Sequence, residues 1–333
     1  MKKLFPYFGA YKKECFLSPL FKLFEAVFEL LVPVVVAKII DVGLGEPLAG
    51  GGYNANTAYI VKMSLLLIGL GLIGLGCAVV AQYFAAKAAT GVSYELRKAL
   101  FSKLQTLSYK DYDRLGTSAM LNRMTGDVQQ FQTGVNMFLR LFLRSPLIVF
   151  GAMIMAFTVD AKAALIFVVT IPLLSIVVFG IMLLTMPLYR RAQAGLDRLL
   201  RRTRENLSGV RVIRAFHKEA EETAQFAEEN ESLTRLQLFV GRISALMNPL
   251  TYVLINSAIV ALIWTGAWQV ERGALTQGQV VALVNYMSQI LVELIKFANL
   301  ILNITKSVAC AGRISQVLET KSSMADGQDA LPD

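Results

Sequence analysis

The sequence predicts an all-α membrane protein with six transmembrane helices and long cytoplasmic helical extensions. Of its 333 residues, 55% are hydrophobic and 17% are charged, whereas a soluble domain carries about 25% charged residues. The apolar residues are concentrated in runs of about 20 or more, which is the length a helix needs to cross a bilayer. Basic residues gather in the connections on one side of these runs. This pattern excludes a soluble globular enzyme and a disordered chain as first interpretations.

The chain is predicted to begin with an interfacial segment, residues 1–15. Its apolar residues would lie in the membrane surface while its lysines face water; they are Leu4, Phe5, Tyr7, Phe8 and Tyr11. Six apolar segments follow, each long enough for a membrane helix. They cover residues 18–42, 58–84, 135–158, 162–186, 245–270 and 276–305. Residues 16–319 are therefore predicted to form one six-helix membrane domain.

The connections between the apolar segments predict the orientation of the chain. Residues 85–134 contain seven Lys and Arg, and residues 187–244 contain eleven. The connections on the opposite side contain one basic residue, Arg272. Because Lys and Arg collect on the cytoplasmic side, both long loops and both termini are predicted to be cytoplasmic. Topology thus explains the net charge of +9, and no nucleic-acid partner is expected.

The two long loops are predicted to be helical hairpins. The first loop contains no proline, and the second contains none after its first residue, Pro187. In the first loop, leucines recur every three or four residues from Leu96 to Leu107, which is helical spacing. The second loop shows the same spacing from Leu196 to Val210. We therefore expect the membrane helices to continue into the cytoplasm and turn back.

The helical pattern breaks near the middle of each loop. The first break, residues 108–118, contains two aspartates and Gly116, which are typical of caps and turns. In the second, residues 208–219, a short apolar patch around Phe216 is flanked by basic residues. Both breaks are predicted to be short cross-helices at the tips of the hairpins.

Few residues of this chain suit metal or covalent chemistry. The three cysteines are far apart in or beside apolar runs, with no metal-ligand spacing and no disulfide framework. His217 is the one histidine, and it is interpreted as a surface residue of the second tip. We therefore assign no catalytic residue and no metal ligand.

Ionisable and polar residues inside the spans are candidates for a substrate pathway. Glu25 and Glu29 can share a helix face with Lys22, and Glu293 can pair with Lys296. An ionisable group in a membrane segment should face a cavity or a partner, so these residues form either a polar patch on the pathway or interfacial salt bridges. The candidate pathway residues are Glu25, Glu29, Asn256, Asn285, Tyr286, Gln289, Glu293 and Asn299.

Four stretches in this order resemble the transmembrane domain of bacterial ABC exporters, especially the heterodimeric multidrug exporters. They are YDRLGTSAMLNRMTGDVQQFQ (112–132), ENLSGVRVIRAFHKE (205–219), GALTQGQVVALVNYMSQI (273–290) and AGRISQVLE (311–319). The first matches the pattern that follows the first coupling helix of such a domain, and the second matches its second coupling segment. The last two match the entry and exit of its sixth span. The resemblance covers essentially the whole chain.

The resemblance implies a function as the membrane half of an ATP-driven exporter in a bacterial inner or plasma membrane. Its partners would be nucleotide-binding domains and a second half-transporter, with a heterodimer favoured over a homodimer. The substrate would be a small amphipathic drug, lipid or peptide. Because the tips lie farthest from the bilayer, a cytoplasmic ATPase would meet them first. The candidate coupling residues are Tyr109, Asp111, Tyr112, Asp113, Arg214, Phe216, His217 and Lys218.

The chain departs from that family in one respect. No stretch fits the phosphate-binding pattern G-x-x-x-x-G-K-[ST], so no ATPase activity is assigned to residues of this chain. ATP and Mg²⁺ are expected on nucleotide-binding domains outside it. Residues 320–333 are interpreted as the start of a linker to such a domain, in a truncated chain or in a subunit whose ATPase is separate.

Two other functions compete with the exporter. An ATP-independent secondary transporter also suits six spans, but the two long charged hairpins have no role in such a carrier. A membrane scaffold without transport is the other alternative, because this chain carries no motor of its own. ATP-dependent flux would distinguish the three.

Overall fold

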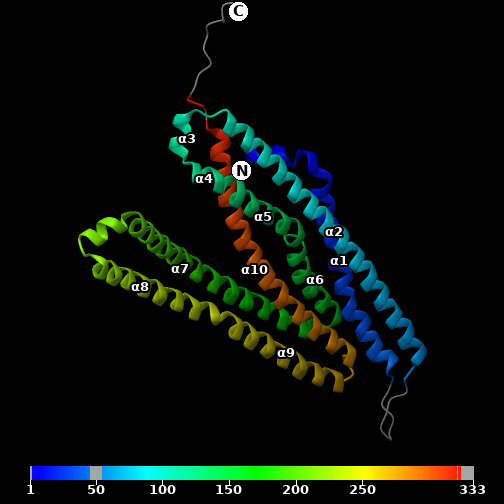
Figure 1. Cartoon of the computed structure of the whole chain (residues 1–333). Coiled ribbons are helices and arrows are strands. Elements are labelled where there is room, and N and C mark those ends of the chain that lie inside the picture. The colour runs from blue at the N-terminus through cyan, green and yellow to red at the C-terminus, as the bar shows by residue number, and fades with distance from the viewer. Residues whose placement is uncertain (1, 46–54, 321, 324–333) are drawn as a thin grey trace, which may run out of the picture. The chain divides into compact units, whose positions relative to one another are not determined.

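The computed structural model describes residues 2–45, 55–320 and 322–323, and all secondary structure within them is helical. The elements are η1 (Lys2–Tyr11), α1 (Lys12–Lys38), η2 (Ile39–Gly43), α2 (Thr57–Gln105), α3 (Tyr109–Leu115), α4 (Thr117–Asn122), η3 (Arg123–Asp127), α5 (Val128–Leu141), α6 (Arg144–Val159), α7 (Ala161–Ala215), α8 (Glu219–Ala245), α9 (Met247–Glu271) and α10 (Gln277–Glu319). They are labelled where there is room in Figure 1. The chain divides into two compact units, a second unit of Leu165–Ala261 and a first unit formed by the rest of the described residues.

The all-α membrane architecture predicted from sequence is confirmed. Within the described residues, five helical stretches are long and apolar enough to cross a membrane. They are Thr57–Gln105, Thr117–Val159, Ala161–Ala215, Glu219–Glu271 and Gln277–Glu319. The predicted first span falls in α1 and η2, which are helical but carry Lys22, Glu25 and Glu29. The count of six spans therefore stays a prediction.

The long helices extend well beyond the predicted spans. α7 has 55 residues, which at 1.5 Å per residue makes a helix about 80 Å long. A hydrocarbon core of about 30 Å accounts for less than half of that length. α10 continues 14 residues past the predicted end of its span at residue 305, because Gln277–Glu319 is one helix.

The core of the first unit is a contact between α2, α5 and α10. The predicted stripe of α2 is buried, with Leu96 and Leu100 fully enclosed and Leu104 almost so. These side chains pack against apolar residues of α5 and α10 such as Phe131 and Ile314. Burying one leucine stabilises the fold by about 1.5–3 kcal/mol, so this stripe contributes to holding α2 against α5 and α10.

The N-terminal segment differs from its prediction. Leu4 is buried in the same core, and Tyr7, Phe8 and Tyr11 pack against it. Of the five aromatic and apolar residues assigned to the membrane interface, Phe5 is the one that is mostly exposed. The amphipathic pattern thus serves contacts within the protein, because α2 offers small residues such as Ala88 where the segment packs.

Hydrogen bonds and close packing at one junction join α1 and η2 to the start of α10. The Asp41 carboxylate accepts hydrogen bonds from the hydroxyl of the N-cap residue Thr276 (2.6 Å) and from the Gly278 N–H (2.7 Å), which has no acceptor within the first turn of its helix. A side chain at position 278 would overlap the backbone carbonyl oxygen of Ala37, so the junction requires glycine there. It fixes the ends of two helices that are more than 230 residues apart in sequence.

The second unit contains the long hairpin of α7 and α8, which lie side by side in Figure 1. The predicted separate cross-helix at 208–219 is wrong, because α7 continues without a break to Ala215 and only a short turn precedes Glu219. His217 adopts a left-handed backbone conformation (φ 52°) in this turn. The acidic residues in the first turn of α8 stabilise this helix, because their negative charge interacts favourably with the positive end of the helix dipole.

Candidate functional site

A buried cluster of charged residues joins α1, α6 and α10. The Arg144 guanidinium is almost fully buried and contacts three carboxylates. It donates a hydrogen bond of 2.8 Å to Glu293 and one of 2.6 Å to Glu29, and its Nε lies 3.8 Å from Glu25. The Ser145 hydroxyl donates a further hydrogen bond of 2.9 Å to Glu293. We call Arg144 and these three glutamates the Arg144 cluster.

Two lysines complete the charge balance of the Arg144 cluster. Lys296 lies 2.8 Å from Glu293, and Lys22 pairs with Glu25. Three carboxylates thus face one guanidinium and two ammonium groups, and the formal charges cancel. A charged group at the centre of a bilayer costs about 2.5–3.5 kcal/mol on insertion scales, and pairing offsets this cost. The cluster can therefore hold α1, α6 and α10 together.

The glutamates predicted from sequence are brought together here, but their partner was not predicted. Arg144 lies within the predicted span 135–158, where an arginine is as unusual as a glutamate. The available sign of a basic partner was that the predicted spans that meet Arg144 together contain more acidic than basic residues. Within the cluster, Glu29 is the most accessible carboxylate, with 38% of its side chain exposed.

The polar residues of α10 lie on two different faces. Asn285 and Asn299 are exposed on one face, and Gln289 is partly buried beside them. Tyr286 is fully buried, and its hydroxyl donates a hydrogen bond of 2.6 Å to the Leu30 carbonyl of α1. The structure thus uses Tyr286 for helix packing and leaves Asn285 and Asn299 accessible, while the Gln289 Oε1 is buried with no hydrogen-bond partner in the described part of the chain.

Asn256 lies in the second unit, on α9. Its side chain is exposed and donates a hydrogen bond of 2.8 Å to the Tyr252 carbonyl, one turn earlier in the same helix. This local bond is the common way for an asparagine to satisfy its polar group within a helix. Asn256 is therefore not part of the Arg144 cluster.

The first hairpin tip contains the predicted short helix, α3. Ser108 caps it in a capping box with Asp111, and Gly116 ends it with a positive φ of 77°. The four predicted coupling residues point in different directions. Tyr109 is 91% exposed and Asp113 is exposed, whereas the Tyr112 hydroxyl donates a hydrogen bond to the Leu104 carbonyl of α2.

Asp111 is buried, unlike its neighbours on α3. Its Oδ2 accepts hydrogen bonds from the Ser323 N–H (2.9 Å) and from the Ser108 hydroxyl (2.8 Å). These donors stabilise the charged form, with the Ser323 N–H as the largest cause, so the pKa of Asp111 is lowered to about 2. Asp111 is ionised at every physiological pH.

The second hairpin tip exposes all four of its predicted coupling residues, Arg214, Phe216, His217 and Lys218. Phe216 is 72% exposed, which is unusual for a phenylalanine surrounded by charged residues. Lys218 forms an exposed ion pair of 2.7 Å with Glu221. The tip therefore presents an exposed apolar side chain with basic neighbours, a combination suited to a contact with a partner.

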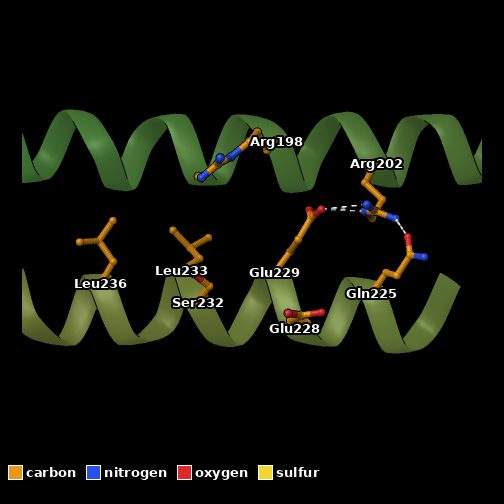
Figure 2. A pocket seen from close by; sticks show the side chains of 9 residues that line it. Arg198, Arg202, Gln225, Glu228, Glu229, Ser232, Leu233 and Leu236 are labelled. Atoms are coloured by element: carbon orange, nitrogen blue, oxygen red, sulfur yellow. Dashed lines mark hydrogen bonds and ion pairs between the residues drawn. The ribbon is translucent and has the colours of Figure 1, made fainter. Parts of the chain in front are cut away.

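Ion pairs inside the hairpin hold α7 to α8. Figure 2 shows Arg202 of α7 reaching Glu229 and Gln225 of α8 across a cavity of about 400 Å³. Its guanidinium lies 2.9 Å from Glu229 and donates a hydrogen bond of 2.6 Å to Gln225. These contacts are half-exposed, and they align the two helices that carry the second tip.

A further charged pair joins the C-terminal end of α10 to η3. Arg313 donates two hydrogen bonds to the carboxylate of Asp127, which is buried. The guanidinium holds the pKa of Asp127 below its usual value, and the carboxylate raises the pKa of Arg313. Within the described ranges, no group of three His, Cys, Asp or Glu side chains is placed to hold a metal ion.

Comparisons with known proteins agree on one family. The model of the ABC transporter transmembrane region matches residues 15–294. An uncharacterized ABC transporter ATP-binding protein of Mycobacterium tuberculosis is 31% identical over 316 residues, which cover 95% of this chain and 53% of that protein. An uncharacterized ABC transporter ATP-binding protein of Bacillus subtilis is 28% identical, over 96% of this chain and 55% of that protein.

A third relative has a name that refers to export. It is a putative export ATP-binding/permease protein of Rickettsia typhi, 26% identical over 85% of this chain and 48% of its own length. The chain spans about half the length of the curated relatives it matches. The match thus corresponds to one part of each relative.

Proposed function

Because this chain belongs to the family of ABC transporter transmembrane regions, we propose that it is the membrane-spanning half of an ATP-driven exporter. Its substrate is a small amphipathic molecule, such as a drug, a lipid or a peptide. The family membership carries this proposal, and the word export in the name of the Rickettsia typhi relative favours its direction. Transport requires the whole protein, of which this chain corresponds to about half in its relatives.

The proposed assembly pairs this chain with a second half-transporter, and a heterodimer is favoured over a homodimer. It lies in a bacterial cell membrane as a multi-pass protein, with both termini in the cytoplasm. The basic residues of 85–134 and 187–244 support this orientation. The assembled pathway takes its substrate from the cytoplasm or from the inner leaflet.

Nucleotide-binding domains dock on the two hairpin tips in this proposal. The length of the helices supports tips that lie far from the bilayer, and their exposed side chains favour a contact with a cytoplasmic partner. Tyr109 and Asp113 offer this contact on the first tip, and Phe216 offers it on the second, together with Arg214, His217 and Lys218. Asp111 and Tyr112 act behind this surface, since both are hydrogen-bonded within the chain.

The residues of this chain do not fit a nucleotide. The sequence has no phosphate-binding loop of the G-x-x-x-x-G-K-[ST] pattern. In the part of the chain that the structure describes, no cluster of acidic side chains is suited to the magnesium ion that accompanies ATP. ATP and Mg²⁺ are therefore proposed to bind to the docked domains. The proposed role of this chain is to convert a displacement of the tips into a rearrangement of its membrane helices.

The substrate pathway is proposed to follow the exposed face of α10. Asn285 and Asn299 supply exposed hydrogen-bonding groups there, and Gln289 lies partly buried beside them. Glu29 supplies negative charge at the accessible edge of the Arg144 cluster. An amphipathic molecule is the kind of substrate that a surface with few polar groups among apolar ones can bind.

Phe216→Ala tests the coupling part of this proposal in the full-length transporter. Phe216 is exposed, so the substitution should change the stability by less than about 0.5 kcal/mol. If Phe216 fills a pocket on a docked domain, its loss weakens that contact by about 2 kcal/mol or more. Substrate-stimulated ATPase activity and transport should then fall together.

Leu207→Ala is the matched control. Leu207 is an equally exposed apolar residue of α7, but it lies about two turns before the tip. It should leave transport and ATPase activity near normal. Equal losses in both variants, or a loss of thermal stability in Phe216→Ala with normal transport by the folded fraction, would contradict the coupling role.

A further inference from the structure

Asp111 connects two segments that are more than 200 residues apart in sequence. Its Oδ2 accepts hydrogen bonds from the N–H of Ser323 (2.9 Å) and from the Ser323 hydroxyl (3.2 Å). The same oxygen accepts bonds from the N–H (3.2 Å) and the hydroxyl (2.8 Å) of Ser108. The segment that leaves α10 is thus bound to the N-terminus of α3, and we call this arrangement the Asp111 clamp.

Hydrogen bonds hold Ser323 to α3, beside the apolar core against which Leu115 of α3 and Leu318 of α10 both pack. A cavity of about 460 Å³ lies between α3 and the end of α10, lined by Arg114, Glu319 and Thr320 among others. The neighbouring surface is therefore not filled by side chains. Bonds to a charged acceptor are about twice as strong as neutral ones, so replacing the carboxylate should loosen the segment after α10 and leave the bond between the Ser108 and Ser323 hydroxyls as its remaining link to the tip.

The clamp and the exposed surface of α3 share one rigid element. Tyr109 points outward and Asp111 points inward, although they are two residues apart on a helix of seven residues. The Tyr112 hydroxyl ties the same helix to the Leu104 carbonyl of α2. A displacement of the segment after α10 is therefore transmitted to the outward face of α3 and to α2.

We propose that Asp111 is a positioning residue that makes the exit of α10 and the first hairpin tip move as one body. The proposal rests on the proposed function only in what is coupled: motion of the chain beyond residue 323 would reach the tip through this bond as well as through the surface of Tyr109. The link itself is a property of the contacts between Ser108, Asp111 and Ser323.

Cysteine crosslinking measures the clamp without any transport assay. The full-length protein would carry Ser108→Cys and Ser323→Cys, with Cys15, Cys77 and Cys310 replaced by alanine. The backbone N–H groups of 108 and 323 still bind Asp111, so oxidation should form the disulfide rapidly. Adding Asp111→Ala should slow its formation at least fivefold, whereas adding Asp113→Ala, an exposed aspartate on the same helix, should not.

Substrate-stimulated ATPase activity measures the consequence of the clamp. In the protein without introduced cysteines, Asp111→Ala should reduce the stimulation, whereas Lys110→Ala, at an exposed residue of α3 that is assigned to no contact, should not. Forming the disulfide in the Asp111→Ala background should restore it, which a merely structural role would not predict. The proposal is overturned if Asp111→Ala leaves the crosslinking rate unchanged, or if the disulfide restores nothing.

The two proposals can fail separately. A protein that shows no ATP-dependent activity in any variant contradicts the proposed function, and the crosslinking rates still decide whether Asp111 holds the two segments together. Asp111→Glu is the second variant in case alanine impairs folding. It keeps the charge but moves it by one methylene group, so it should slow crosslinking less than alanine and more than Asp113→Ala.

Discussion

Arg144→Ala is expected to be among the most destabilising single substitutions in the first unit. It removes the guanidinium that contacts Glu293, Glu29 and Glu25. Glu293, whose side chain is only 3% exposed, then loses its arginine partner. Lys296 and Ser145 remain as partners, so Glu293 keeps part of its stabilisation. Breaking a buried ion pair by removing one partner costs about 3–5 kcal/mol.

This free energy predicts a measurable change in melting temperature. Domains of 150–250 residues shift by about 2–4 °C for each kcal/mol, which gives a decrease of roughly 6–20 °C for Arg144→Ala. Thermal unfolding of the full-length protein in one detergent, followed by an apolar-binding dye or by light scattering, measures it. Arg144→Lys should recover only part of the loss, because an ammonium group cannot contact three carboxylates in a fixed fork.

Arg140→Ala is the matched control for the charge and size of the lost side chain. Arg140 lies one turn earlier, is partly buried, and forms no ion pair with any residue of the described ranges. It should cost less than about 1 kcal/mol. Adding Glu293→Ala to Arg144→Ala should cost less than the sum of the two single changes, by about 0.5–3 kcal/mol. Equal effects of the two arginines, or additive effects in the cycle, would refute the reasoning.

Three further predictions concern contacts outside the Arg144 cluster. Gly278→Ala should destabilise by about 1–3 kcal/mol through overlap with the backbone of α1, whereas Gly312→Ala in open space on α10 should be neutral or stabilising, as thermal unfolding would reveal. The pKa of Asp111 is lowered from an ordinary value of 3.8 to about 2, so its stabilising contribution is present above the ordinary value and is lost as the pH falls through 2. The crosslinking rate between positions 108 and 323 can be compared at each pH with and without Asp111→Ala, and the effect of thiol protonation cancels in the ratio of the two rates. This ratio should therefore approach one only as the pH falls toward 2. Arg202→Ala should speed hydrogen exchange in α7 and α8 near the second tip and nowhere in α10, and uniform exchange would contradict its role.

Sequence patterns predicted the helices well because each depends on local spacing. The leucine stripe of 96–107 has the period of one helix face, and the structure buries it against α5 and α10. Ser108 and Asp111 flank a break that is a capping box in the structure. At the second tip the same reasoning failed, because Ser208 and Gly209 resemble a break. An exposed helix tolerates a glycine at a cost of about 1 kcal/mol, and α7 continues through it.

Contacts between distant segments could not be predicted in the same way. Arg144 meets Glu29 and Glu293 across 115 and 149 residues, and no local pattern specifies that pairing. The direction of Asp111 was equally hidden. It resembles a contact residue like Asp113 in the sequence, and only the position of Ser323 shows that it points inward. Local spacing thus identified the charged residues, while their partners required the fold.

Substrate flux in inside-out vesicles tests the central claim, that this chain is the membrane half of an ATP-driven exporter. Vesicles containing the full-length protein would be given a fluorescent amphipathic dye, with and without ATP and Mg²⁺. The account predicts dye accumulation that requires hydrolysable ATP and falls in the Phe216→Ala variant but not in Leu207→Ala. Accumulation that follows an ion gradient without ATP, or no accumulation of any amphipathic probe, would contradict it.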